Sequence, residues 1–144
     1  MEKFLGLDYG DKTVGVAVSD AMGWSAHCVD VLRRKEGESI NKTLDKIAEY
    51  ATLHEAQTLV LGLPKSLDNT EGERCVKTRS FSKKLQKRLP DHKIVFFDER
   101  YTTAAAERLL LEADVRRKKR SDVIDKMAAA QILQGFLDSR PKTN

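Results

Sequence analysis

The sequence predicts an α/β protein with a five-stranded mixed sheet and helices on both faces. Two observations support this prediction. Apolar residues alternate between a period of two, typical of strands, and a period of about 3.6, typical of helices. The segments follow the order β-β-β-α-β-α-β-α-α. Three successive strands indicate an antiparallel meander, whereas helical crossovers between the later strands indicate parallel pairing.

The N-terminal part of the chain predicts three strands joined by short turns. Residues 3–9 form an apolar run, and residues 13–19 alternate between valines and small residues. The link at residues 10–12 contains glycine and aspartate, which supply turn geometry, so these two strands form a hairpin. Residues 26–33 form a third, weaker strand.

Helices and strands alternate over the remaining chain. Ser39 is expected to cap a helix whose apolar stripe consists of Ile40, Leu44, Ile47, Ala48 and Ala51. Residues 58–61 form a short strand that the Gly62-Leu63-Pro64 segment ends. Then follow a helix at residues 73–89, a strand at residues 93–97, a helix that Thr102 or Thr103 caps and that ends near Ala113, and a last helix at residues 122–138. We expect one domain at residues 1–138 and a flexible tail at residues 139–144.

Composition and charge exclude several classes of protein. No apolar run approaches the roughly 20 residues of a membrane span, and the N-terminus does not resemble a signal peptide, so we expect a cytoplasmic protein. Cys28 and Cys75 lack metal-ligand spacing, and His27, His54 and His92 are scattered, so a zinc site finds no support. The net charge of +4 favours a polyanionic partner, although weakly.

Three carboxylates occupy positions that belong to core elements. Asp8 ends the first strand, Glu99 follows the fifth strand, and Asp125 lies on a helix face that is otherwise apolar. Burying an unpaired carboxylate is expensive, so these side chains need a cation or several hydrogen-bond donors. Carboxylates at strand ends and on an inward helix face can converge. The sequence therefore predicts one divalent-metal site.

Each acid also has a simpler interpretation. Asp125 could respond to the helix dipole shortly after the helix-start signal at Ser121 and Asp122. Asp8 could be a turn residue, and Glu99 could form a surface ion pair. Asp122, one turn before Asp125, is a candidate fourth acid or partner of the metal ligands, although a first-turn dipole acid is the favoured interpretation. Three further acids rank lower, as turn or solvent residues: Asp11, Asp20 and Asp98.

Five motifs in register carry a resemblance to a known family. They are Gly6-Leu7-Asp8-Tyr9-Gly10, Gly15-Val16-Ala17-Val18-Ser19-Asp20, Gly62-Leu63-Pro64, Asp98-Glu99-Arg100-Tyr101-Thr102-Thr103, and Asp125 with Ala128-Ala129 and Ile132-Leu133-Gln134. In this order, over nearly the whole chain, they resemble the YqgF family. That family has an RNase H-like fold, and its members are described as Holliday junction resolvases and as pre-16S rRNA nucleases.

The resemblance places the catalytic acids of that family on Asp8, Glu99 and Asp125. It implies that these acids hold Mg²⁺ or Mn²⁺. Such hard cations take oxygen ligands, and Mg²⁺ keeps several waters, so a few carboxylates and a substrate phosphate can complete its shell. Two ions roughly 3.5–4 Å apart could activate the attacking water and stabilise the departing oxygen.

Basic residues are expected to hold the nucleic acid. The densest charge run, just before the helix of Asp125, consists of Arg116, Arg117, Lys118, Lys119 and Arg120; a solvated linker is the equally favoured alternative. Lys12, Arg79 and Lys83 are weaker candidates. Tyr9 and Tyr101 could stack on an unpaired base, although packing is the favoured role for both.

The expected function is that of a metal-dependent endonuclease in 5′-end maturation of precursor 16S rRNA. The first alternative is a Holliday junction resolvase acting on branched DNA, which would need two active sites and hence a symmetric homodimer, whereas a monomer could trim rRNA. The second alternative is a non-catalytic factor that binds RNA or a ribosomal particle. A sugar-kinase-like phosphotransferase ranks last, because a chain of this length lacks the second half that would close over a nucleotide.

Overall fold

The computed structural model describes residues 2–65, 71–99 and 118–140, and the side chains of residues 118–126 lie outside this description. Five strands form one sheet in the order β3-β2-β1-β4-β5. Their bounds are β1 (Phe4–Tyr9), β2 (Thr13–Ser19), β3 (Ala26–Arg33), β4 (Thr58–Leu63) and β5 (Lys93–Asp98). The five predicted strands are confirmed.

The strands of this sheet pair in both senses, as the sequence predicts. β1 pairs with β2 and β2 pairs with β3 in antiparallel register. β4 pairs with β1 on one side and with β5 on the other, in both cases parallel. The carboxyl ends of β1, β4 and β5 therefore lie at the same end of the sheet.

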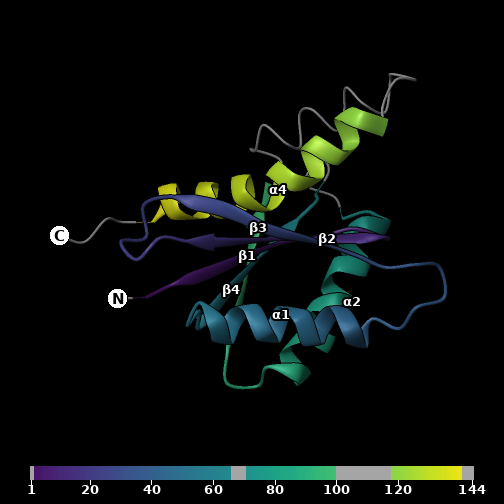
Figure 1. Ribbon diagram of the computed structural model, residues 1–144, viewed down its shortest axis with the longest axis horizontal. Coiled ribbons are helices and arrows are strands. Elements are labelled where there is room, and N and C mark those ends of the chain that lie inside the picture. The colour runs from purple at the N-terminus through teal and green to yellow at the C-terminus, as the bar shows by residue number, and fades with distance from the viewer. Residues whose placement is uncertain (1, 66–70, 100–117, 141–144) are drawn as a thin grey trace.

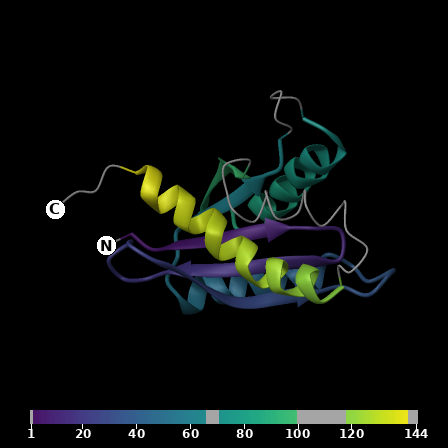
Figure 2. The ribbon, with the colours of Figure 1, turned by 90° about the horizontal axis from the view of Figure 1, so that it is seen from above.

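Helices cover both faces of the sheet, which Figure 1 shows nearly edge-on. α1 (Asn41–Leu53) and α2 (Glu73–Arg88) lie on one face, and α4 (Lys118–Ser139) lies on the other. Figure 2, seen from above, shows α4 running obliquely across the strands. Among the described helices, none combines the length and the apolar character that a bilayer span requires. The helix predicted to start at Thr102 or Thr103 lies outside the described residues.

The alternation of side chains along β1 divides the core into two parts. Leu5 and Leu7 pack with residues of α1 and α2 in the larger cluster. Phe4 belongs to the smaller cluster beneath α4. Because successive side chains of a strand point to opposite faces, Gly6 and Asp8 share the α4 face with Phe4.

Glycines allow α4 to approach the sheet closely. A Cβ atom at Gly6 would lie 2.6 Å from Cβ of Leu133, which is closer than real Cβ atoms come to one another. In the opposite direction, a Cβ atom at Gly135 would lie 2.7 Å from the ring of Phe97 in β5. At these two positions the backbone of one element lies directly against side chains of the other, and only glycine leaves enough room.

Polar and aromatic contacts fix the direction of α4. The side-chain amide of Gln134 accepts a hydrogen bond from the backbone of Ala26 at 3.0 Å and donates one to the carbonyl oxygen of Trp24 at 2.9 Å. Near the end of the helix, the ring of Phe136 meets the ring of Phe4 edge-on at 5.3 Å. These contacts place the C-terminal part of α4 over the start of β1.

Three predicted boundaries are wrong. β4 continues through Gly62 to Leu63 because both residues pair with β5, so the glycine does not break the strand. α1 has Ile40 at its N-cap, although the Ser39 hydroxyl still accepts a hydrogen bond from the backbone of Asn41 at 3.1 Å. α4 begins at Lys118, before the predicted start, because lysine and arginine are good helix formers.

We expect Gly6→Ala to lower the free energy of unfolding by about 1–3 kcal/mol, because the added methyl group would crowd Leu133 and overpack the core. Chemical denaturation measures this effect. Gly72→Ala is the control, since a Cβ atom at Gly72 meets no atom within 4 Å. Equal free energies of unfolding for the two variants would contradict the close packing of α4.

We expect Tyr50 to titrate later than an ordinary tyrosine. Its hydroxyl donates a 2.6 Å hydrogen bond to Asp30, and this bond, with burial, raises the pKa of Tyr50 to about 12. Because the folded-state pKa exceeds the unfolded value of about 10, the stabilisation is complete below pH ~10 and is lost as the pH rises through ~12. Tyrosinate absorbance should show a late step that Tyr50→Phe removes. A late step that persists in the variant would refute the assignment.

Candidate functional site

Asp8 lies at the carboxyl end of β1 on the face that α4 covers. Its backbone is opposite Gly15 of β2, which has no side chain to fill the space on that face. The Asp8 side chain is only 6% exposed. The structure therefore places a buried carboxylate where the sequence predicts a metal ligand, inside the strand rather than in the turn that follows it.

Glu99 directly follows β5 and is 4% exposed. Its carboxylate reaches over the neighbouring strand, since a Cβ atom at Gly62 of β4 would lie 2.7 Å from Oε2 of Glu99. The same Cβ atom would collide with the side chain of Ile132 in α4, so the carboxylate lies on the α4 face. The interpretation of Glu99 as a surface residue is wrong.

The register of the parallel strands brings these two acids to the same place. Leu7 of β1 is opposite Leu61 of β4, so Asp8 and Gly62 are the next residues along two adjacent strands. Glu99 lies against Gly62. Both buried carboxylates thus lie on the same face at the carboxyl end of the parallel strands. Asp8 belongs to β1, and the Glu99 carboxylate lies over the adjacent strand β4.

The backbone of α4 carries Asp125 toward the same end of the sheet. Phe136 contacts Phe4 at the start of β1, whereas the Ala129 carbonyl lies over Gly6, farther along that strand. Moving toward the N-terminus of the helix therefore means moving toward the end of β1, where Asp8 lies. The predicted apolar helix face is confirmed at Ala128, Ala129 and Ile132, all of which are buried.

The side chains of Asp122 and Asp125 lie outside the described part of the chain. Among the side chains that are described, no group of three or more His, Cys, Asp or Glu residues is arranged to hold a metal ion. Of the three predicted metal ligands, the structure describes the side chains of Asp8 and Glu99. The position of the Asp125 side chain stays a prediction.

Two of the lower-ranked acids have partners among the described residues. Asp20 accepts hydrogen bonds of 2.8 Å from the Trp24 backbone and from the Ser25 hydroxyl, and these bonds lower its pKa. Asp11 pairs with Lys77 of α2 at 3.1 Å. Asp20 thus stabilises a turn, and Asp11 links the hairpin to α2.

The predicted nucleic-acid contacts differ in their surroundings. Lys12 is exposed in the β1–β2 hairpin, at the same end of the sheet as Asp8. Lys83 is exposed on α2. Arg79 is engaged within the protein, with Nη2 at 2.8 Å from Glu71 and the guanidinium 5.0 Å from the ring centre of Phe96. The Glu71 carboxylate, in turn, has its pKa lowered by this partner.

The basic run is only partly described. Lys118, Lys119 and Arg120 belong to the first turn of α4, so at these positions the linker interpretation is wrong. Arg116 and Arg117 lie outside the described residues, as does Tyr101. Tyr9 stacks on Phe81 at 4.4 Å between ring centres, which confirms the packing role predicted for it.

Sequence reasoning missed the part that Gly62 plays in the site. The residue was interpreted as a strand breaker, whereas it gives the Glu99 carboxylate and Ile132 room against β4. A glycine within an otherwise apolar strand is a known sign that another group approaches the backbone closely. That signal was present in the sequence.

Comparison with known proteins identifies the family. Residues 2–139 match the family described as "RuvX: Holliday junction resolvase". A protein of Staphylococcus carnosus strain TM300, named "Putative pre-16S rRNA nuclease", is 53% identical over 137 residues, which cover 95% of this chain and 96% of that protein. A protein of the same name from Staphylococcus aureus strain JH9 is 50% identical over the same length.

Solved structures with little sequence identity share the fold. RuvC of Thermus thermophilus, in complex with a Holliday junction substrate, superposes with a TM-score of 0.60 at 12% identity, covering 97% of this chain and 96% of RuvC. The fowlpox virus Holliday junction resolvase gives a TM-score of 0.53 at 10% identity and covers 96% of this chain and 99% of its own. With its five-stranded RNase H-like sheet and its match over nearly the whole sequence, this chain belongs to the RuvX family of nucleases, also called YqgF.

Proposed function

We propose that this chain is a metal-dependent endonuclease that hydrolyses phosphodiester bonds of precursor 16S rRNA. The observation that carries the proposal is the pair of buried carboxylates, Asp8 and Glu99, at the carboxyl end of the parallel strands. Ligands of open α/β sheets typically bind at this end. In a metal-dependent nuclease, such carboxylates hold the cation beside the phosphate group that is cleaved.

The donor set fits a hard divalent cation. Both described side chains offer only carboxylate oxygens, which Mg²⁺ and Mn²⁺ prefer over nitrogen or sulfur. Both are nearly excluded from water, where a nearby cation offsets the cost of burying negative charge. We propose that Asp8, Glu99 and Asp125 hold the ion, with Asp122 as a further acid beside it. The bound cation would supply an activated water and stabilise the departing oxygen.

The basic residues support the polyanionic substrate. Lys12 lies in the hairpin directly after the strand of Asp8, and the backbone of the first turn of α4 carries three consecutive basic residues. Phosphate contacts of this kind hold a strand in register without reading its sequence. We infer that Lys12 and residues 116–120 position the backbone, whereas Arg79 and Lys83 contribute less.

The choice of RNA rests on the relatives. Proteins that are 50–53% identical over almost the whole chain carry the name of a pre-16S rRNA nuclease. The description of the family favours the second candidate, a resolvase of branched DNA. The two functions differ in assembly as well, because a resolvase cuts two opposed strands and works as a symmetric dimer, whereas rRNA trimming requires only one active site. The solution mass separates these candidates.

The carboxylates are tested by cleavage of matched precursor-rRNA and four-way-junction substrates in Mg²⁺ or Mn²⁺. We expect Asp8→Asn, Glu99→Gln and Asp125→Asn each to lower the cleavage rate by at least about 100-fold, since even residues that only orient metal ligands contribute about 10–100-fold. Chelation should abolish cleavage, and added Mg²⁺ should restore it.

Thermal unfolding of each variant provides the control, because loss of activity counts only in a folded protein. Equal cleavage by wild type and Asp8→Asn would reject Asp8 as a catalytic residue. Cleavage of the junction alone would transfer the proposal to branched DNA. Binding of precursor rRNA without cleavage by the wild type or by any variant would favour the non-catalytic factor.

Gly62→Ala tests the position of the Glu99 carboxylate. We expect it to lower the cleavage rate more than Gly6→Ala does, because both substitutions crowd α4 but only the Cβ atom at position 62 meets Glu99. The rates are compared at temperatures where both variants are folded. Equal losses of rate would show that only the packing of α4 matters.

A further inference from the structure

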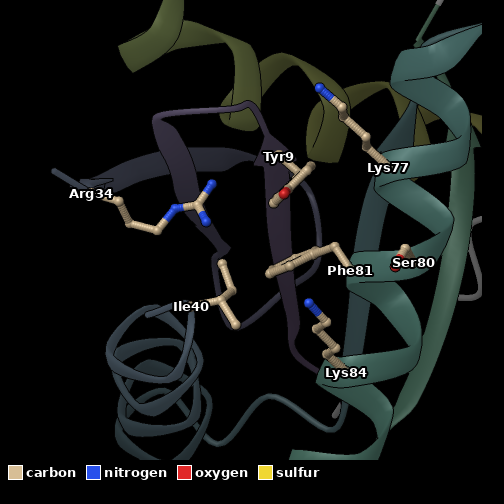
Figure 3. A pocket seen from close by; sticks show the side chains of 7 residues that line it. All are labelled: Tyr9, Arg34, Ile40, Lys77, Ser80, Phe81 and Lys84. Atoms are coloured by element: carbon tan, nitrogen blue, oxygen red, sulfur yellow. The ribbon is translucent and has the colours of Figure 1, made fainter. Parts of the chain in front are cut away.

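A second polar site lies behind the hairpin, on the face of the sheet that α1 and α2 cover (Figure 3). It is a half-open pocket of about 120 Å³ between the end of β1, the segment after β3, and α2. Arg34, Lys77 and Lys84 lie around it, and none of the described residues that line it is acidic. The volume corresponds to that of about four liquid waters at about 30 Å³ each, enough for a small polyatomic anion.

The inner wall of the pocket is rigid. Phe81 is buried in the core and stacks on Tyr9 at 4.4 Å between ring centres. The guanidinium of Arg34 lies 5.7 Å from the centre of the Tyr9 ring, and Figure 3 shows it pointing toward that ring. The cation is thus held in place before any ligand arrives, which lowers the entropic cost of binding.

The Arg34 guanidinium forms no ion pair with any residue that the structure describes. Its Nη2 donates to the carbonyl oxygens of Gly10 at 3.3 Å and Asp11 at 2.6 Å, and carbonyl groups carry no net charge. Its Nε is buried without a hydrogen-bond partner in the part of the chain that the structure describes. Arg34 as a whole is half-buried, but leaving a buried N–H donor without a partner is costly. An anion in the pocket would offset that cost.

The two lysines differ in their partners. Lys77 is balanced by Asp11 at 3.1 Å and by Glu73 at 3.5 Å. Lys84 forms no ion pair with any residue that the structure describes, and Figure 3 shows its amine directed toward Phe81. Arg34 and Lys84, which have no ion-pair partner among the described residues, therefore line the pocket from the segment after β3 and from α2.

We propose that this pocket binds a phosphate group of the substrate strand. A planar guanidinium and an ammonium group are the usual donors to phosphate oxygens. Tyr9 and Asp8 are consecutive in β1 and lie on opposite faces, so the pocket lies across the sheet from the candidate cleavage site. Lys12 lies in the hairpin at the end of the sheet, where a strand that contacts both the cleavage site and the pocket would pass from one face to the other. The nucleic-acid source rests on the proposed function, whereas the phosphate chemistry rests on the pocket alone.

The first arm of the test measures binding of single-stranded RNA by the full-length Asp8→Asn protein, which should not cleave its ligand. Lys84→Gln is compared with Lys87→Gln, which removes the same charge from an exposed position of α2 outside the pocket. We expect Lys84→Gln to weaken binding severalfold and to reduce the slope of log K against log salt by about 0.7, the value of one contact to a single strand. Lys87→Gln should change neither quantity by as much.

The second arm uses inorganic phosphate with the wild-type chain. We expect phosphate, but not chloride at the same ionic strength, to shift the amide NMR signals of Tyr9 and Phe81. Lys84→Gln should weaken this response, and Lys87→Gln should preserve it. Because Lys84 is exposed, its substitution should leave the thermal midpoint unchanged.

The outcomes separate the sources of the phosphate group. A selective effect of Lys84→Gln on RNA binding supports the nucleic-acid backbone as the ligand. Selective phosphate shifts without an effect on RNA binding would overturn that source and assign the pocket to a free phosphate compound. Equal behaviour of both variants in both arms would overturn the site altogether. If the Asp8→Asn protein without a further substitution binds no RNA, the proposed function fails, and the phosphate arm still decides whether the pocket binds an anion.

Discussion

The close approach of α4 to the sheet is the contact on which the rest of the structure depends. Gly6 and Gly62 offer bare backbone to the helix, and Ile132 and Leu133 fill the space that side chains at those glycines would occupy. Larger residues there would lift the helix away from the sheet. Ile132 of α4 lies against Gly62 beside the Glu99 carboxylate, and both Asp8 and Glu99 are buried at this end of the sheet.

Near this end of the sheet, the two faces carry groups of opposite charge. On the α4 face, Asp8 and Glu99 are buried carboxylates, and these are the residues proposed to hold a divalent cation. On the other face, Arg34 and Lys84 surround a pocket without acidic lining residues among those described. The hairpin after β1 lies at this end of the sheet. Under the proposed function, a phosphodiester strand that meets a bound cation on one face can also meet the positive charge of the pocket on the other.

The sequence predicts the strands well because period-two alternation and turn residues are local signals. It also predicts that Asp8 and Glu99 lie at the ends of core strands, where the structure places both carboxylates buried; their role as metal ligands stays a prediction. The start of α4 was missed because the Ser121-Asp122 cap signal outweighed the helix propensity of the basic run. The pocket could not be predicted, because Tyr9, Arg34 and Lys84 come together only through the pairing of distant segments.

The sheet order also determines when the candidate site can form during folding. The meander of β1, β2 and β3 consists of contacts that are local in the sequence and form quickly. The site instead requires the parallel pairs of β4 with β1 and β5, each closed by a crossover, and then the docking of the C-terminal helix. Since α4 follows all five strands in the chain, the helix that carries Asp125 is synthesised after the strands that carry Asp8 and precede Glu99. The topology thereby delays completion of the candidate site until α4 has been made and has docked on the sheet.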